Sequence, residues 1–94
     1  MPRAIWNGRV LAEGEKYEVV EGNVYFPPES LRSEFFRESN HTTTCSWKGE
    51  ARYLTASVDG EEAVNVAWYY PDPKGAAENI RDYVAFYPRV TVER

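Results

Sequence analysis

The sequence predicts a mainly β fold of antiparallel sheets with one α-helix near residues 73–85. Its apolar residues favour strands, because ten Val and two Ile stand against three Leu and one Met. Turn signals separate short runs rich in Val, Tyr, Trp or Ile; they are Asn7-Gly8, Glu13-Gly14, Glu21-Gly22 and Asp59-Gly60. Only the segment after Pro71 repeats its apolar residues at helical spacing.

The first four predicted strands cover residues 3–6, 9–12, 17–21 and 23–26. The short turns between them favour a meander in which each strand pairs with the next. Pro27-Pro28 ends the fourth strand, because proline cannot donate to a sheet ladder. Residues 29–40 are too polar and too aperiodic to assign, although Phe35 and Phe36 are expected to anchor this stretch to the core.

The clearest local unit is a hairpin of residues 50–58 and 61–70 around Asp59-Gly60. A two-residue type I′ turn would pair positions whose numbers add up to 119. Side chains alternate between the faces of a sheet, so this register divides the hairpin into a core face and a partly wet face. The core face would carry Ala51, Tyr53, Thr55, Val64, Val66 and Trp68, and the wet face Arg52, Ala56, Ala63 and Asn65.

The open end of the hairpin leads into the predicted helix. The same register places Lys48 beside Pro71 and Trp47 beside Asp72, so residues 45–49 are expected next to residues 69–73. Asp72 is the expected helix cap and Pro73 suits the first helical position. Pro88 ends the helical pattern, and the alternating residues 89–93 predict a last strand.

Length and composition bound the functional class. The 94 residues fit one domain. A net charge of −4 and a pI near 5.0 argue against a nucleic-acid partner. The chain opens without an apolar signal segment, and no apolar run approaches the roughly 20 residues that span a bilayer, so no membrane partner is expected. One cysteine cannot form an internal disulfide, which favours a cytoplasmic protein.

The only cysteine and the only histidine lie in one short segment, residues 40–49. Cys45 could act as a nucleophile with His41 as its base, because a thiolate needs a base or a positive field. The alternative is an inert, packed Cys45 and a hydrogen-bonding His41, since cysteine is among the most buried residue types. These two residues cannot complete a zinc site, and we expect no metal and no other cofactor.

A second candidate site surrounds Lys48. The inferred register puts Trp47, Lys48, Tyr69 and Tyr70 near the start of the predicted helix, where a small anionic or aromatic ligand could bind. Successive residues on a strand face opposite sides, so only one of the two tyrosines can lie in the core. The alternative is that Lys48 is a surface cation that neutralises Asp72 or Glu50.

A resemblance to a known family rests on Thr44–Tyr53, Ala67–Pro73, Ile80 and Val84–Tyr87, together with Trp6-Asn7-Gly8 and Val24–Pro27. In these residues the chain resembles domain-of-unknown-function family 427. These are small proteins found mainly in bacteria and some fungi. The resemblance covers nearly the whole chain, with Ser46 where the family usually has proline. It implies compact, coiled antiparallel sheets similar to the Mss4-like β folds, with one helix.

The resemblance supplies no activity. A nucleotidyltransferase-like label is attached to the family, but it implies an acidic pair of metal ligands, and no two carboxylates of this chain converge. Mss4-like relatives often hold zinc on pairs of cysteines, which this chain lacks. The chain also has no phosphate-binding glycine motif and no Cys-x-x-Cys.

Three functional hypotheses follow from the sequence. The first is a small domain that binds a ligand near Lys48. The second is an interaction module whose exposed aromatic side chains form a homo-oligomer or a partner surface. The third is an enzyme with Cys45 as its nucleophile.

Overall fold

The computed structural model describes residues 1–94 and contains nine strands and three short 3-10 helices. The prediction of a mainly β fold with antiparallel sheets is confirmed. The elements are β1 (Arg3–Trp6), β2 (Arg9–Glu13), β3 (Glu18–Val20), β4 (Asn23–Tyr25), η1 (Pro28–Ser30), η2 (Ser33–Phe35), β5 (Phe36–Cys45), β6 (Gly49–Val58), β7 (Glu61–Tyr69), η3 (Gly75–Ile80), β8 (Val84–Phe86) and β9 (Thr91–Glu93).

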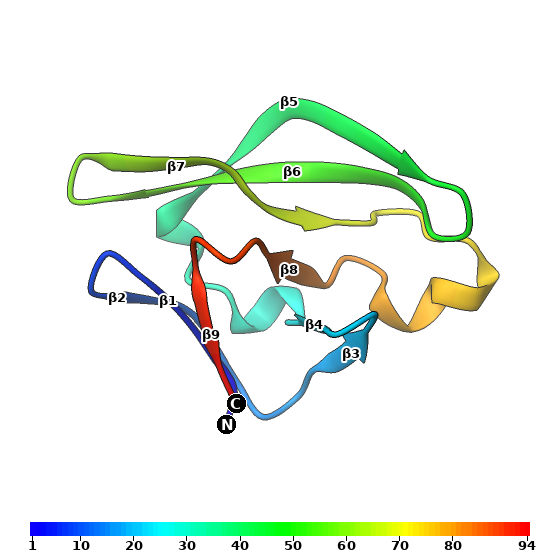
Figure 1. The fold of residues 1–94 in the computed structure, drawn as a ribbon, viewed down its shortest axis with the longest axis horizontal. Helices are drawn as coiled ribbons and strands as arrows, with labels where there is room; N and C mark the ends of the chain where they lie inside the picture. The colour runs from blue at the N-terminus through cyan, green and yellow to red at the C-terminus, as the bar shows by residue number, and fades with distance from the viewer.

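The largest sheet has the order β5-β6-β7-β8, and its long hairpins form the upper layer of Figure 1. The predicted hairpin turn is present: Asp59 and Gly60 have φ values of 50° and 81°. Both values are positive, as a type I′ turn requires. The previously unassigned stretch before Asn40 forms η1, η2 and the start of β5, and Phe35 and Phe36 pack against the core as expected.

The predicted register holds only next to the turn. Val58 pairs with Glu61 and Ala56 with Ala63, but a bulge then shifts β7 so that Tyr53 lies opposite Trp68 instead of Val66. The bulge contains Asn65 at φ 53°, and its N–H donates to the Thr55 hydroxyl at 3.1 Å. A bulge leaves residues unpaired and turns the strand locally.

This bulge changes which side chains are buried. Val64, predicted for the core face, is 63% exposed, whereas Val66 is 3% exposed. Ala56 and Ala63, predicted for the wet face, are fully buried. β6 therefore buries side chains on both of its faces, Leu54 and Ala56 on one and Tyr53 on the other.

The predicted meander of the first four strands is wrong. β1 and β2 pair with each other, but β1 also pairs with the last strand in the order β2-β1-β9, while β3 and β4 form a separate two-stranded sheet. The two chain ends consequently lie together at the bottom of Figure 1. Besides its pairing with β1, β2 forms one isolated β-bridge, between Ala12 and Leu31.

The predicted α-helix at residues 73–85 is also corrected. Only the 3-10 helix η3 forms there, with a kink at Ala77 (φ −114°), and its cap is Lys74 rather than Asp72, whose side chain is 93% exposed. Residues 84–86 become strand β8 instead. β8 pairs with β7 on one side and with Phe26 on the other. Its backbone N–H and C=O groups therefore find hydrogen-bond partners in distant segments rather than within a helix turn.

The core consists of two clusters. The larger cluster has 14 buried residues and joins all three sheets; Leu11, Phe26, Leu54 and Phe86 are among its members. The smaller cluster has seven, including Tyr25, Tyr53, Tyr70 and Ile80. Tyr53 and Leu54 are neighbours on β6 and belong to different clusters, so the open end of the main sheet packs on both of its faces.

Candidate functional site

A cavity of about 700 Å³ opens on the face of the main sheet that carries Tyr53 and Trp68. The β3–β4 turn bounds one side of this cavity and the C-terminal segment bounds the other. Its two charged lining residues, Lys48 and Arg94, are both cations. The lining comprises Gly22, Asn23, Val24, Lys48, Tyr53, Trp68, Tyr70, Phe86, Tyr87, Pro88, Val90, Thr91, Val92 and Arg94.

Aromatic rings form one wall of the cavity. Trp68 contacts Tyr87 with 4.6 Å between ring centroids, and it meets the buried Tyr25 edge-on at 6.2 Å. The indole Nε1–H of Trp68 donates to the Tyr25 hydroxyl at 3.2 Å. Tyr53 and Tyr87 are stacked at 6.3 Å. The rings are thus held in fixed orientations that suit the binding of a flat apolar body.

A line of hydroxyl groups runs along this wall. The Tyr53 hydroxyl lies 3.0 Å from the Thr43 hydroxyl and 3.2 Å from that of Tyr87. The hydrogen bond with Tyr53, together with burial, raises the pKa of Tyr87 to about 12. The Tyr87 phenol therefore stays neutral at physiological pH and can donate or accept a hydrogen bond.

Lys48 is the buried charge of the site, with a side chain only 7% exposed. Its ammonium group forms an ion pair with Glu21 and lies 5.0 Å from the centre of the Trp47 ring and 5.6 Å from that of Tyr70. Burial alone would lower the pKa of Lys48, but the hydrogen bond with Glu21 and nearby charges outweigh it and raise the pKa. The same hydrogen bond lowers the pKa of Glu21.

The backbone around Gly49 explains the position of Lys48. Gly49 has φ 113°, and a Cβ at this position would lie 3.3 Å from the carbonyl oxygen of Asp72. The close approach lets the Lys74 N–H donate to the Lys48 carbonyl at 2.9 Å. The predicted neighbourhood of residues 45–49 and 69–73 is therefore nearly right, but Lys48 lies beside Lys74 rather than beside Pro71.

The structure brings together three of the four predicted ligand-binding residues. Trp47, Lys48 and Tyr70 are in contact, and burial raises the pKa of Tyr70. Tyr69 instead lines a second groove, as the alternation of side chains along a strand requires. The alternative partners of Lys48, Asp72 and Glu50, are not the ones found.

Sequence reasoning missed Glu21 and Tyr87. Glu21 was visible only as part of a turn signal, and its contact with Lys48 joins elements 27 residues apart. The apolar spacing that predicts a helix runs from Ala76 to Tyr87, so the sequence favours a helical position for Tyr87. It reaches the cavity because residues 84–86 form a strand next to Trp68.

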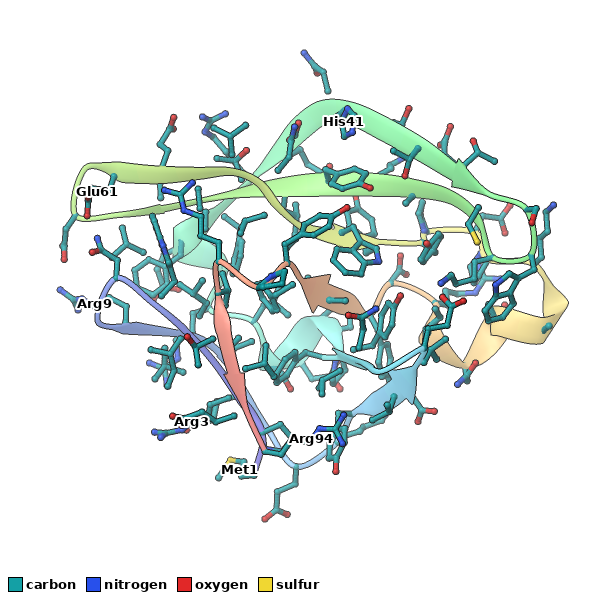
Figure 2. All side chains as sticks on the ribbon, viewed as in Figure 1. Met1, Arg3, Arg9, His41, Glu61 and Arg94 are labelled. Atoms are coloured by element: carbon teal, nitrogen blue, oxygen red, sulfur yellow. The ribbon has the colours of Figure 1, made fainter.

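Cys45 and His41 both lie on β5. Cys45 is half-buried against the smaller core cluster. His41 is exposed on β5, where Figure 2 shows it at the outer edge of the molecule, and its ring packs on Tyr53 at 4.6 Å. Four residues of extended strand separate the two backbones by about 13 Å. A base must lie within hydrogen-bond reach of its nucleophile, and no hydrogen bond joins these two.

Two further observations concern metal binding and membrane-spanning helices. No group of three or more His, Cys, Asp or Glu residues lies close enough together to hold a metal ion. None of the helices has the length and apolar character needed to cross a membrane.

Comparison with protein families gives one match. Residues 2–94 match the family described as "Domain of unknown function (DUF427)", which agrees with the resemblance read from the sequence. No curated protein matches the chain.

Proposed function

We propose that this chain, which belongs to the family described as Domain of unknown function (DUF427), binds a small aromatic anion in the cavity beside Lys48. The observation that carries the proposal is the lysine itself. Its side chain is nearly buried at the rim of an aromatic cavity that has no acidic lining residue.

The size and the walls fit a small ring-shaped ligand. Small-molecule sites measure about 300–1,000 Å³ and are mostly apolar with a few polar groups. The Lys48 cavity has about 700 Å³ and combines the rings of Trp68, Tyr70 and Tyr87 with the hydroxyls of Tyr53 and Thr91. An aromatic ligand would stack on the indole and accept or donate a hydrogen bond at the phenols.

The charge fits an anion. Burying an ammonium group is costly unless an anion compensates it, and Glu21 supplies that anion in the free protein. The Glu21 side chain is 54% exposed and sits on a tight turn with Gly22. A carboxylate or phosphate of the ligand can therefore replace Glu21 at Lys48, while Glu21 returns to water at little cost.

A ligand screen tests the proposal. Aromatic carboxylates and aryl phosphates are screened by thermal shift, and dissociation constants of hits are measured by calorimetry. Lys48→Met should weaken binding by about tenfold or more, because it removes the buried cation. Lys16→Met, at an exposed position, should leave it unchanged. Equal affinity in the two variants, or no hit among these acids, would refute the site.

A second candidate function is self-association through β5. This strand lies at the edge of the main sheet and has ten residues, so one side of it lacks a strand partner within the chain. Free edges can pair with another copy. Light scattering over a range of protein concentrations decides this point. A mass that rises to twice 10.8 kDa supports pairing, whereas a constant mass of 10.8 kDa contradicts it.

A further inference from the structure

A second groove, of about 510 Å³, lies on the face of the main sheet opposite to Trp68. Tyr69 marks this face, since it follows Trp68 on β7 and pairs with Val84 on β8. The groove is separate from the Lys48 cavity, because the two share no lining residue. Its lining comprises Pro28, Leu31, Ser33, Phe36, Glu38, Leu54, Tyr69, Asp82 and Val84.

The charged lining residues of this groove are two acids, Glu38 and Asp82. Glu38 accepts a hydrogen bond from the Tyr69 hydroxyl and has no cationic partner. Asp82 makes neither an ion pair nor a side-chain hydrogen bond. Both carboxylates thus lack a counter-ion within the chain.

The arginines nearby do not supply one, because each is paired with an acid outside the groove. Arg52, which lies opposite Tyr69 on β6, pairs with Glu50 at 3.6 Å, and Arg81 binds Glu78 at 2.8 Å. Two further pairs complete this set, Arg32 with Glu13 and Arg37 with Glu62. Arg52 therefore acts on the groove only at a distance, by its charge on Tyr69, and makes no ion pair with Glu38 or Asp82.

The rest of the lining is apolar. Leu54 and Val84 form the floor on the sheet, with Phe36 and Leu31 at the side. The Tyr69 ring adds a face that attracts cations. Burial, followed by the hydrogen bond to Glu38 and the charges of Glu38 and Asp82, raises the pKa of Tyr69 to about 12, against the opposing charge of Arg52.

We infer that this groove binds a small organic amine, whose ammonium group lies between Glu38 and Asp82 and whose apolar body lies on Leu54, Val84 and Tyr69. The inference does not depend on the proposed function, because it concerns another face and a ligand of opposite charge. The chain would then carry two separate small-molecule sites, one for an anion and one for a cation.

The probe for this inference is 2-phenylethylamine, with 2-phenylethanol as its neutral match. Amide chemical shifts are followed by NMR in low salt during titration with each compound. The amine should shift amides around Glu38, Leu54 and Asp82 and bind at least about tenfold more tightly than the alcohol. Added salt should weaken the binding of the amine, since the carboxylates that attract it are solvent-accessible.

Two double variants provide the matched comparison. Glu38→Gln with Asp82→Asn removes both charges but keeps an acceptor for Tyr69 and a residue that tolerates φ 62° at position 82. Glu29→Gln with Glu34→Gln removes two exposed acids that do not line the groove. The first pair should abolish the preference for the amine, and the second should leave it intact.

Three outcomes would overturn the inference: no amine binding at millimolar concentration, equal binding of the alcohol, or equal loss in both double variants. Shifts confined to residues of the Lys48 cavity would also overturn it. Lys48→Met should not change amine affinity, so the failure of this groove and the failure of the Lys48 site are distinguishable.

Discussion

Lys48 and Glu21 form an unequal ion pair, because the lysine is buried and the glutamate is largely in water. In such a pair most of the cost of disruption comes from leaving the buried charge alone. Trp47 and Tyr70 offset part of that cost by their ring faces. The pair is therefore a sensitive point of the molecule for both stability and ligand exchange.

The pair predicts a specific dependence of stability on pH. The pKa of Glu21 is lowered from 4.5, so its contribution is present above pH 4.5 and is lost as the pH falls through the folded-state pKa. The pKa of Lys48 is raised from 10.5, so its contribution is present below pH 10.5 and is lost as the pH rises through its folded-state pKa. Glu21→Gln should therefore lower the free energy of unfolding at neutral pH and have progressively less effect in acid.

Urea denaturation of both proteins along a pH series measures this difference. Glu29→Gln is the control, because Glu29 is exposed and has no ion-pair partner. A Glu21→Gln effect that is the same in acid as at neutral pH would contradict the predicted role of the pair.

Tyr25 is the second residue whose polar group decides stability. Its side chain is fully buried, and its hydroxyl accepts the indole N–H of Trp68. Tyr25→Phe would leave that donor unpaired and should lower the free energy of unfolding by about 1–3 kcal/mol. Denaturant titration measures the change. Tyr17→Phe, at an exposed tyrosine without a hydrogen bond, should change it by less than about 0.5 kcal/mol.

At the scale of elements, the β5–β6 connection depends on Gly49. Its positive φ and the nearby carbonyl of Asp72 leave no room for an unstrained side chain. Gly49→Ala should therefore destabilise the protein by roughly 1–3 kcal/mol. Gly75 has open space around it, so Gly75→Ala should be nearly neutral. Thermal unfolding of both variants tests this; equal effects would show that the turn has no such constraint.

The bulge in β7 makes a second prediction for an element. Val64 and Val66 have the same parity on one strand, yet only Val66 is buried. Val66→Ala should cost about 1–3 kcal/mol in unfolding free energy, whereas Val64→Ala should cost less than about 0.5 kcal/mol. In a regular strand, the two substitutions would lower the free energy of unfolding by similar amounts. Chemical denaturation of the two variants therefore reports on the bulge itself.

For the whole molecule, the larger core cluster connects all three sheets. Leu11 on β2 is fully buried in it, and the tryptophans report on both sheets, because Trp6 lies on β1 beside β2 and Trp68 lies on β7 of the main sheet. The chain should therefore unfold as one cooperative unit. Leu11→Ala should lower stability by about 2–5 kcal/mol and shift tryptophan fluorescence and far-UV circular dichroism equally. Separate transitions by the two probes would contradict a single domain.

The local elements were largely predictable because they depend on neighbouring residues. Asp59-Gly60 indicated its turn, and the prolines at 27 and 28 marked the end of a strand. Lys48, Trp47 and Tyr70 were predicted to meet because a hairpin register relates them by simple counting. The alternation of side chains along a strand also indicated that only one of Tyr69 and Tyr70 would lie in the core, and Tyr70 is the buried one.

The sequence by itself determined the fold class, the turn of the main hairpin and the meeting of Trp47, Lys48 and Tyr70. Only the tertiary structure decided the pairing of β1 with β9, the bulge at Asn65, the conversion of residues 84–86 into a strand and the contact between Glu21 and Lys48. The physical reason is the distance along the chain between the residues that interact. Turn and strand preferences are set by adjacent residues, whereas these four features depend on competition among partners that are distant in the chain and meet only when the core closes.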